Sequence, residues 1–233
     1  MSVSELKISL RLQQIDQMIT DRYNNIFDCC CDHGLLGQTL LHRKAGDTIH
    51  FVDVVESIMT QLRQQLEQQF SELTETRWQI HCQDVATLKL PDTGKSLIII
   101  AGVGGDLLID LVSEITDRYP GLPLEFILCP VYHNYKVRTA LIGWGFNLLN
   151  EQLVRDNNQF YEILHVSKNL ANPKASVLSA VGSQMWDLSR PDHRQYLERT
   201  IQHYQRMAQR QQSEVMEIVS QYKTLKSDKL AEL

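Results

Sequence analysis

The chain has 233 residues, of which 43% are hydrophobic and 22% are charged. This length suffices for one ordinary domain with an appendage, and the composition is too apolar for a disordered tail. No apolar run approaches the ~20 residues of a membrane-spanning helix, and no signal-peptide core is seen, so neither membrane insertion nor export is expected. The net charge of −5 excludes a uniformly basic nucleic-acid binder but allows a local basic patch.

Five cysteines are present, and three of them are consecutive: Cys29, Cys30 and Cys31. Because neighbours along a strand point to opposite faces, this run does not make a disulfide framework, and we expect a reducing, cytoplasmic location. The run also lacks the CxxC spacing of a zinc site and has no second cluster to complete one. We interpret these cysteines as small hydrophobic side chains of a buried strand, and we predict no metal.

Apolar periodicity predicts the elements in chain order. Residues 6–19 have the spacing of a short amphipathic helix, and strands then alternate with helices. A turn signal at 156–158 predicts a hairpin between the last two strands. The predicted strands are residues 26–31, 48–54, 77–82, 97–101, 125–129, 146–154 and 160–166, and the predicted helices are 35–41, 56–72, 106–119 and 135–144.

This alternation predicts a mostly parallel sheet covered by helices on both faces, with the final hairpin as an antiparallel edge. The order and number of elements are typical of the α/β, Rossmann-like class I methyltransferase fold with a seven-stranded sheet, since a plain dinucleotide-binding fold normally lacks the hairpin. We therefore divide the chain into a methyltransferase domain (1–168), a linker (169–190) and a C-terminal helical appendage (191–233).

The appendage is predicted to be one long helix with a coiled-coil-like heptad seam. Such a seam needs a partner helix, either in the same chain or in a second copy, so a helix-mediated homodimer is one possibility. Trp186 and Leu188 are predicted to pack the appendage against the domain. The seam consists of Leu197, Ile201, Tyr204, Ala208, Gln211, Val215, Ile218, Tyr222 and Leu225.

The turn after the first strand carries two carboxylates, Asp28 and Asp32, with His33 and Gly34 beside them. In a doubly wound sheet, ligands bind at the carboxyl ends of the strands near the topological switch point. Two carboxylates would repel a pyrophosphate, whereas they suit a sulfonium with an ammonium group, so they favour S-adenosylmethionine over NAD. The alternative is that Asp32 only caps the following helix.

Further candidates follow the next three strands. Asp53 has the spacing of an acid that binds ribose hydroxyls, and Asp84 could receive the adenine amino group. The glycines at 102, 104 and 105 would allow close backbone approach to the reacting groups. The alternatives are solvated loop acids and a tight turn that opens the next helix.

Residues 129–138 place aromatic side chains beside basic ones at the end of a strand. This combination suits a flipped base and its phosphates, and the alternative is helix capping and core packing. Between Arg190 and Arg210 the chain has five basic residues and two acidic ones, a mild asymmetry that also fits a solvated helix face.

Four segments together resemble the bacterial tRNA (adenine(22)-N1)-methyltransferase family. They are Leu-Lys-Ile-Ser-Leu-Arg-Leu at 6–12, Asp-Cys-Cys-Cys-Asp-His-Gly at 28–34, Ile-Ala-Gly-Val-Gly-Gly at 100–105 and Tyr-Glu-Ile-Leu at 161–164. The chain departs from the family pattern at Cys30, where the motif has glycine. It also has Cys-Pro-Val at 129–131 in place of Gln-Pro-Asn, and one long helix where the family has two coiled-coil helices.

The resemblance implies methyl transfer from S-adenosylmethionine to N1 of an adenine in tRNA. It implies Asp32 as the carboxylate that stabilises the positive ring, with His33 beside it. The implied cofactor-binding residues are Arg11, Asp28, Cys30, Asp32, His33, Gly34, Asp53, Val54, Asp84, Val85, Ala101, Gly102, Val103 and Gly104. The expected RNA-binding residues are Tyr132, Lys136, Arg138, Arg155, Arg194, Arg199, Arg206 and Arg210.

Two alternatives stay open. The acidic body and the missing polar groups at 129–131 would suit a methyltransferase with a small-molecule or protein acceptor. Cysteine in place of the motif glycine at position 30 would suit a catalytically weakened module that binds the cofactor and interacts with RNA or with a second copy.

Overall fold

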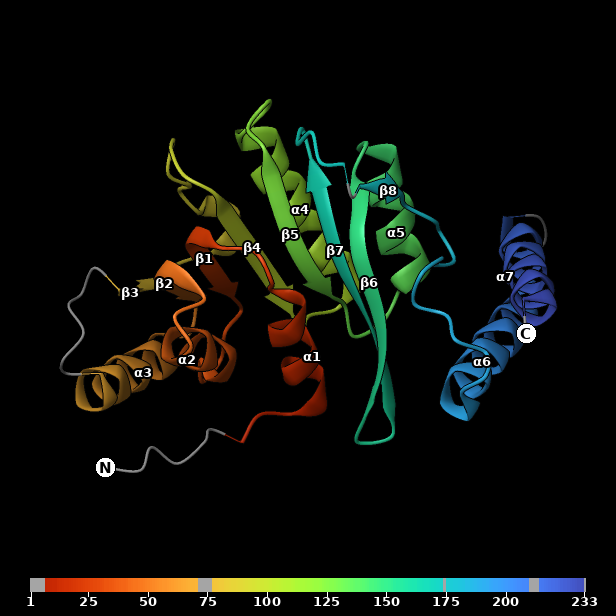
Figure 1. Cartoon of the computed structure of the whole chain (residues 1–233), viewed down its shortest axis with the longest axis horizontal. Coiled ribbons are helices and arrows are strands. Elements are labelled where there is room, and N and C mark those ends of the chain that lie inside the picture. The colour runs from red at the N-terminus through yellow and green to blue at the C-terminus, as the bar shows by residue number, and fades with distance from the viewer. Residues whose placement is uncertain (1–6, 71–76, 174, 210–213, 233) are drawn as a thin grey trace.

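The computed structural model describes residues 7–70, 77–173, 175–209 and 214–232 (Figure 1). The strands are β1 (Tyr23–Cys29), β2 (Gly46–Asp53), β3 (Trp78–Cys82), β4 (Ser96–Ala101), β5 (Leu124–Cys129), β6 (Asn147–Asp156), β7 (Gln159–Lys168) and β8 (Ser176–Val177). The helices are α1 (Leu10–Met18), α2 (Leu35–His42), α3 (Glu56–Gln69), α4 (Gly105–Arg118), α5 (Asn134–Gly143), α6 (Pro191–Ala208) and α7 (Glu214–Ala231), with a 3₁₀ turn η1 (Val85–Thr87). None of the described helices is long and apolar enough to cross a membrane.

The strands form one sheet in the order β3-β2-β1-β4-β5-β7-β6-β8. The first five strands are parallel, and β7 enters antiparallel between β5 and β6, as the predicted hairpin requires. The prediction of seven strands was one short, because Ser176 and Val177 of the predicted linker pair with Leu148 and Asn147 of β6. From β1 the chain adds β2 and β3 on one side, and from β4 it adds β5 and the hairpin on the other side. The topological switch point therefore lies between β1 and β4.

Two helical layers cover the sheet, as expected from strands that are apolar on both sides. Helices α1, α2 and α3 pack on the face that carries Ile26, Ile49 and Ile99. On the opposite face, Phe27 and Ile98 pack with η1, α4 and α5. In Figure 1 the first three helices lie on the viewer's side and α4 and α5 lie behind the strands. The predicted α/β architecture is confirmed.

The C-terminal appendage is a pair of helices and not the single long helix that the heptad spacing predicted. Helices α6 and α7 lie beside β6, outside the sandwich (Figure 1). Leu197, Ile201 and Tyr222 are buried together with Trp186 and Leu188 in a third small core. The seam therefore pairs within the chain, and Tyr204 stacks on Tyr222 with 5.9 Å between ring centroids. Three positions of the predicted elements lie outside the described residues: the start of the first helix at Leu6, the end of the helix at Glu72 and the polar break of the seam at Gln211.

Candidate functional site

A cavity of about 320 Å³ opens at the switch point, between the carboxyl ends of β1 and β4, with α1 as its third wall. This is the position at which open α/β sheets bind their ligands. Ser9, Leu12, Cys31, Leu35 and Leu36 also line it. None of these five was predicted as a site residue, although Ser9, Leu12 and Cys31 stand within two of the quoted motifs and Leu35 and Leu36 directly follow one of them. The predicted site residues that the cavity brings together are Arg11, Asp28, Cys30, Asp32, His33, Ala101 and Gly102.

The turn after β1 has an unusual backbone. Cys30 and Asp32 have φ values of 56° and 49°, in the left-handed region that favours glycine, and Gly34 follows at 65°. A Cβ atom at Gly34 would lie 2.8 Å from Leu62, so glycine is required there for space as well as for conformation. Cys30 thus adopts a glycine-like conformation at the position where the resembling family has glycine.

Asp28 is the buried acid of the cavity, with only 4% of its surface exposed. Its carboxylate accepts the backbone N–H of Gly37, in the first turn of α2, at 2.9 Å. Burial raises the pKa of Asp28 to about 7, and the negative charge of Asp53 adds to the rise, while the Gly37 hydrogen bond opposes it. The carboxyl group is therefore poised to gain stability from a cation in the cavity.

Asp32 is exposed and does not cap α2. Gly34 occupies the N-cap position, so the alternative reading of Asp32 as a helix cap was wrong. The Asp32 backbone N–H donates to the Asp53 carboxylate at 3.1 Å, and Asp53 also accepts the N–H of Val55. His33 lies beside Asp32, with 3.6 Å between His33 Nε2 and Asp32 Oδ1. Asp53 thus fixes the loop, and the exposed Asp32 side chain lines the cavity.

The acids after β2 and β3 share the carboxyl edge of the sheet with this cavity but do not line it. Asp84 accepts the N–H of Ala86 at 2.9 Å and so caps η1, and Val85 is buried under it. Val54 is exposed beyond the end of β2. Roles for Asp53, Val54, Asp84 and Val85 in cofactor binding stay predictions.

The glycine turn after β4 is tied to the loop after β5. The Gly102 N–H donates to the carbonyl of Cys129 at 3.0 Å, and the Val131 N–H donates to that of Val103 at 2.9 Å. A Cβ atom at Gly104 would lie 2.2 Å from the Tyr132 hydroxyl. Gly104 is therefore needed for the close packing of Tyr132 on the turn, and the two loops form one continuous surface.

Arg11 connects α1 to the hairpin. Its backbone N–H donates to the Asp156 carboxylate at 3.2 Å, and its guanidinium lies 5.0 Å from the centre of the Tyr161 ring. A Cβ atom at Gly102 would lie 3.2 Å from Arg11 Nη1, so the cation is directly next to the glycine turn. Arg11 is the cationic side chain of an otherwise acidic cavity wall.

Arg138 does not bind RNA as predicted, because it is fully buried. Its guanidinium lies 2.7 Å from both the Glu151 and the Glu162 carboxylates, which are buried as well. It also donates to the carbonyl of Ser179 in the segment that leads to α6. Glu162 in turn accepts the hydroxyl of Tyr196 from α6 at 2.7 Å. We call Arg138, Glu151, Glu162 and Tyr196 the latch, because together they join the sheet to the appendage.

The other predicted RNA-binding residues that the structure describes are exposed, and several have protein partners. Lys136 pairs with Asp106 at 2.5 Å, and Arg194 donates to the carbonyls of Leu188 and Ser189. Arg206 donates to a carbonyl of its own helix. The guanidinium carbons of Arg155 and Arg199 lie 5.7 and 5.8 Å from the centre of the Phe160 ring, which brings these two cations together. Arg210 lies outside the described residues.

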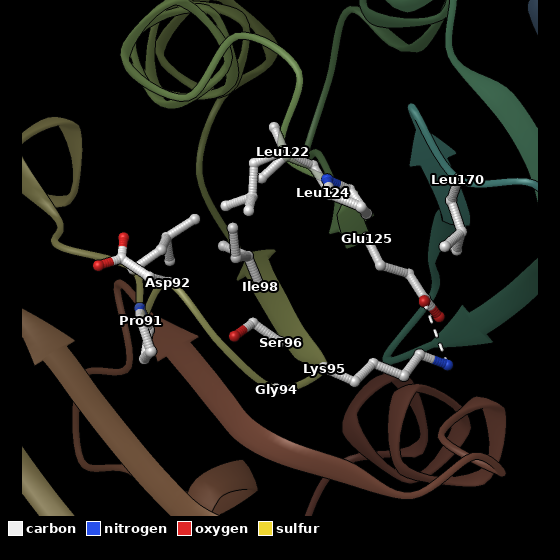
Figure 2. A pocket seen from close by; sticks show the side chains of 12 residues that line it. Pro91, Asp92, Gly94, Lys95, Ser96, Ile98, Leu122, Leu124, Glu125 and Leu170 are labelled. Atoms are coloured by element: carbon white, nitrogen blue, oxygen red, sulfur yellow. Dashed lines mark ion pairs between the residues drawn. The ribbon is translucent and has the colours of Figure 1, made fainter.

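A second cavity, of about 360 Å³, lies at the opposite end of the strands, where β4 and β5 begin (Figure 2). Lys95 and Glu125 meet there with 3.3 Å between Nζ and Oε2. Glu125 also accepts the Tyr23 hydroxyl and pairs with His165, so this carboxylate is used within the fold. The cavity contains none of the predicted site residues and lies at the wrong end of the strands for the cofactor.

Neither cavity offers a metal site. In the part of the chain that the structure describes, no group of three or more His, Cys, Asp or Glu side chains could hold a metal ion. All five cysteines are free, and Cys29 and Cys129 are buried within strands. Of the run 29–31, Cys29 is the buried strand residue that we predicted, whereas Cys30 and Cys31 lie half-buried in the turn after β1 and line the cavity, so the interpretation was wrong for these two.

Comparison with known proteins gives one matching family model and several similar solved structures. A family model described as a methyltransferase domain matches residues 8–164. No curated protein matches the chain in sequence. A solved structure of a candidate tRNA (m1A22) methyltransferase of Streptococcus pneumoniae, in complex with S-adenosyl-L-methionine, is 21% identical with a TM-score of 0.74, over 94% of this chain and 99% of that one.

Two further structures are similar over nearly their whole length. The m1A22 tRNA methyltransferase TrmK of B. subtilis is 18% identical with a TM-score of 0.70, over 98% of this chain and 99% of that one. TrmK of M. capricolum, in complex with S-adenosyl-homocysteine, is 13% identical with a TM-score of 0.70, over 94% and 97% of the two chains. At these identities the similarity shows a shared fold, and the predicted fold class is confirmed.

Proposed function

Because the chain belongs to the methyltransferase domain family, we propose that it transfers the methyl group of S-adenosylmethionine to N1 of an adenine in tRNA. The observation that carries the proposal is the acidic cavity at the switch point, with Asp28 and Asp32 on one wall and the glycine turn on the other. The structural neighbours support the choice of acceptor, since their names give tRNA m1A22 as the product and one of them holds the same cofactor. The cytoplasm, where tRNA is found, remains the expected location.

The residues of the cavity fit this cofactor, which supplies an electrophilic methyl group on a sulfonium. Among the described residues, the Gly37 N–H is the one hydrogen-bond donor to the buried Asp28 carboxylate, and a nearby positive charge would offset its burial. Arg11 would pair with the carboxylate of the amino-acid part. Gly102, at φ 87°, exposes backbone beside Arg11 without a side chain in the way.

The chain's own residues would act mainly by orientation. Adenine N1 has an in-plane lone pair, so no strong base is needed before attack, and alignment with the methyl group is an entropic task. Positive charge arrives on the adenine ring as the methyl group is transferred. Asp32 would stabilise that charge, because its carboxylate is exposed at the opening while its backbone is fixed by Asp53.

The test combines transfer of a labelled methyl group with mapping of the modified base. Wild-type protein and S-adenosylmethionine are incubated with unmodified tRNAs, and 1-methyladenosine is located by mass spectrometry. Asp32→Asn should lower the rate on the order of a hundredfold while cofactor binding persists. Asp117→Asn, an exposed acid near the end of α4, is the matched control and should be fully active.

Absence of transfer to any tRNA, in a protein that binds the cofactor tightly, would exclude the tRNA substrate. Salt dependence separates the remaining acceptors. Phosphate contacts predict a steep loss of affinity as salt increases, whereas a small acceptor predicts little change.

A further inference from the structure

A third cavity, of about 410 Å³, lies between the methyltransferase domain and the appendage. The loop after β5 forms one wall through Tyr132 and His133, and α6 forms the other through Tyr196, Arg199 and His203. Phe160, at the start of β7, lies between these walls. The segment 129–138, in which the sequence places aromatic beside basic residues, supplies four of its lining residues, but the proposed methyl transfer does not use this cavity.

Its lining is aromatic and free of acids. Six of the twelve lining residues are aromatic, although the whole chain is only 7% aromatic. Among the described residues that line it, none is a carboxylate, in a protein whose net charge is −5. The cofactor cavity has the opposite character, since its described lining has two aspartates and no Phe, Trp or Tyr. The two cavities therefore suit ligands of opposite charge.

The inner part of this aromatic cavity, at Tyr196, is held in place by the packing of the fold. The Tyr196 ring stacks between Phe160 at 5.1 Å and Trp186 at 5.7 Å, measured between ring centroids. Its hydroxyl donates to the buried Glu162 and accepts a hydrogen bond from Asn134. This inner part belongs to the packing that attaches α6, and that packing alone would explain Tyr196 and Tyr222.

Packing of α6 does not explain the outer part of the cavity, which consists of Tyr132, Arg199 and His203. Tyr132 is 54% exposed, and Arg199 and His203 are exposed on α6. Arg199 and Arg155 both lie over the half-buried Phe160 ring, with no carboxylate paired to either guanidinium among the described contacts. An open aromatic platform with cations at its rim is the arrangement that binds an unpaired nucleotide, since the base stacks and the phosphate is neutralised.

The cavity adjoins the cofactor site but is separate from it. No residue lines both. They are divided by the glycine turn, on which Tyr132 packs at Gly104 while Gly102 faces the cofactor side. A base held in the aromatic cavity would lie on the other side of the glycine turn from the methyl group, which leaves the cofactor side to a neighbouring nucleotide.

We propose that the aromatic cavity binds an unpaired nucleotide of the RNA substrate adjacent to the adenine that is methylated, with its base on Phe160 and Tyr132 and its phosphate on Arg199. This inference rests on the proposed function, because it takes the acceptor to be RNA. It adds a site for a flanking nucleotide, built partly from the appendage.

The test measures binding of a short single-stranded oligoribonucleotide that contains 2-aminopurine, whose fluorescence is quenched on stacking. Phe160→Leu should weaken binding about fivefold to a hundredfold and remove the quenching, as expected for the loss of one stacked base. Phe160→Tyr keeps the ring and should bind like wild type. Arg199→Gln should lower the slope of log affinity against log salt by about 0.7. The charge control is Arg22→Gln, which changes an exposed arginine directly before β1, at the opposite end of the strands from the cofactor cavity.

Wild-type affinity and quenching in both Phe160→Leu and Arg199→Gln would overturn the proposal. Since Arg199 is exposed, its variant remains informative even if Phe160→Leu fails to fold, which circular dichroism would show. Methyl transfer to tRNA is measured separately on the wild type. If the wild type methylates tRNA and the variants bind normally, only this inference fails, whereas absence of transfer defeats the proposed function whatever the oligonucleotide binding shows.

Discussion

At the scale of single residues, Asp28 gives the cofactor cavity a dependence on pH. Burial raises the pKa of this carboxyl group to about 7, so in the ligand-free protein it is ionised at pH 8 and largely protonated at pH 6. A cationic cofactor favours the ionised form. Binding below pH 7 must therefore release a proton, and this lowers the affinity as the pH falls.

We expect the affinity for S-adenosylmethionine to decrease below pH 7, approaching about tenfold per pH unit. Titration calorimetry at pH 6, 7 and 8 measures this. Asp28→Asn should bind more weakly at pH 8 and lose the slope, while Asp117→Asn should keep it. A wild-type affinity that is constant across this range would show that Asp28 does not face the positive charge.

Cys30 offers a second residue-level prediction. A side chain in the left-handed region costs about 1–2 kcal/mol, and Cys30 has a φ of 56°. Cys30→Gly should relieve this cost, but it also removes the sulfur, which packs on the core. Cys30→Ala removes the sulfur and keeps the cost. We expect the glycine variant to be more stable than the alanine variant by about 1 kcal/mol in urea unfolding, and equal stabilities would contradict the prediction.

The cavity residues at the ends of β1 and β4 could be predicted because strand ends converge at one edge of a parallel sheet. Arg11, on α1, was expected only from the family resemblance. Arg138 could not be placed in this way. In the sequence it lies in a predicted helix close to Lys136 and Thr139, which are both exposed. Its partners Glu151 and Glu162 lie on two later strands. Nothing local distinguishes a buried arginine from an exposed one when the neutralising charges come from distant segments.

At the scale of elements, alternating apolar runs were sufficient to locate the first seven strands. Strand β8 was missed because two residues carry no periodicity and form a strand only where β6 offers a free edge. The appendage was misjudged for a different reason. Its heptad spacing continues from α6 into α7, so a chain that reverses between them has the same periodicity as one straight helix.

The latch supports a prediction about the stability of this arrangement. Burial alone would raise the pKa of Glu151, yet Arg138 and the N–H groups of Ser183 and Gln184 lower it below its ordinary value, so the carboxylate stays charged inside the protein. Arg138→Met would leave it and Glu162 without their cation. We expect a loss of about 3–5 kcal/mol in the free energy of unfolding.

Urea denaturation measures this loss, with the exposed Arg118→Met as the control for the substitution itself. Adding Glu151→Gln and Glu162→Gln to Arg138→Met should recover part of the stability, because the buried charges are then gone. If the single and triple variants are equally unstable, the cost comes from packing and not from charge.

At the scale of the whole molecule, the seam between α6 and α7 bears on oligomeric state. Leu197, Ile201 and Tyr222 of the seam are buried within the chain, and Tyr204, Ile218 and Leu225 pack partly buried against them. We therefore expect a monomer in solution, in place of the helix-mediated homodimer that an unpaired seam would require. Light scattering coupled to size exclusion should give a mass near 26.9 kDa, and twice that value would mean that another face associates.

The latch also has a consequence for how this enzyme would recognise a folded polynucleotide. Arg138 donates to the carbonyl of Ser179 in the segment before α6, and Glu162 accepts the Tyr196 hydroxyl of α6, so a swing of the helical pair would break hydrogen bonds to buried charged side chains. These contacts would hold the aromatic platform at a fixed distance from a methyl donor in the cofactor cavity. Conformational adjustment on association then falls to the nucleic acid, and molecules whose backbone cannot reach both points at that separation would be rejected by geometry alone.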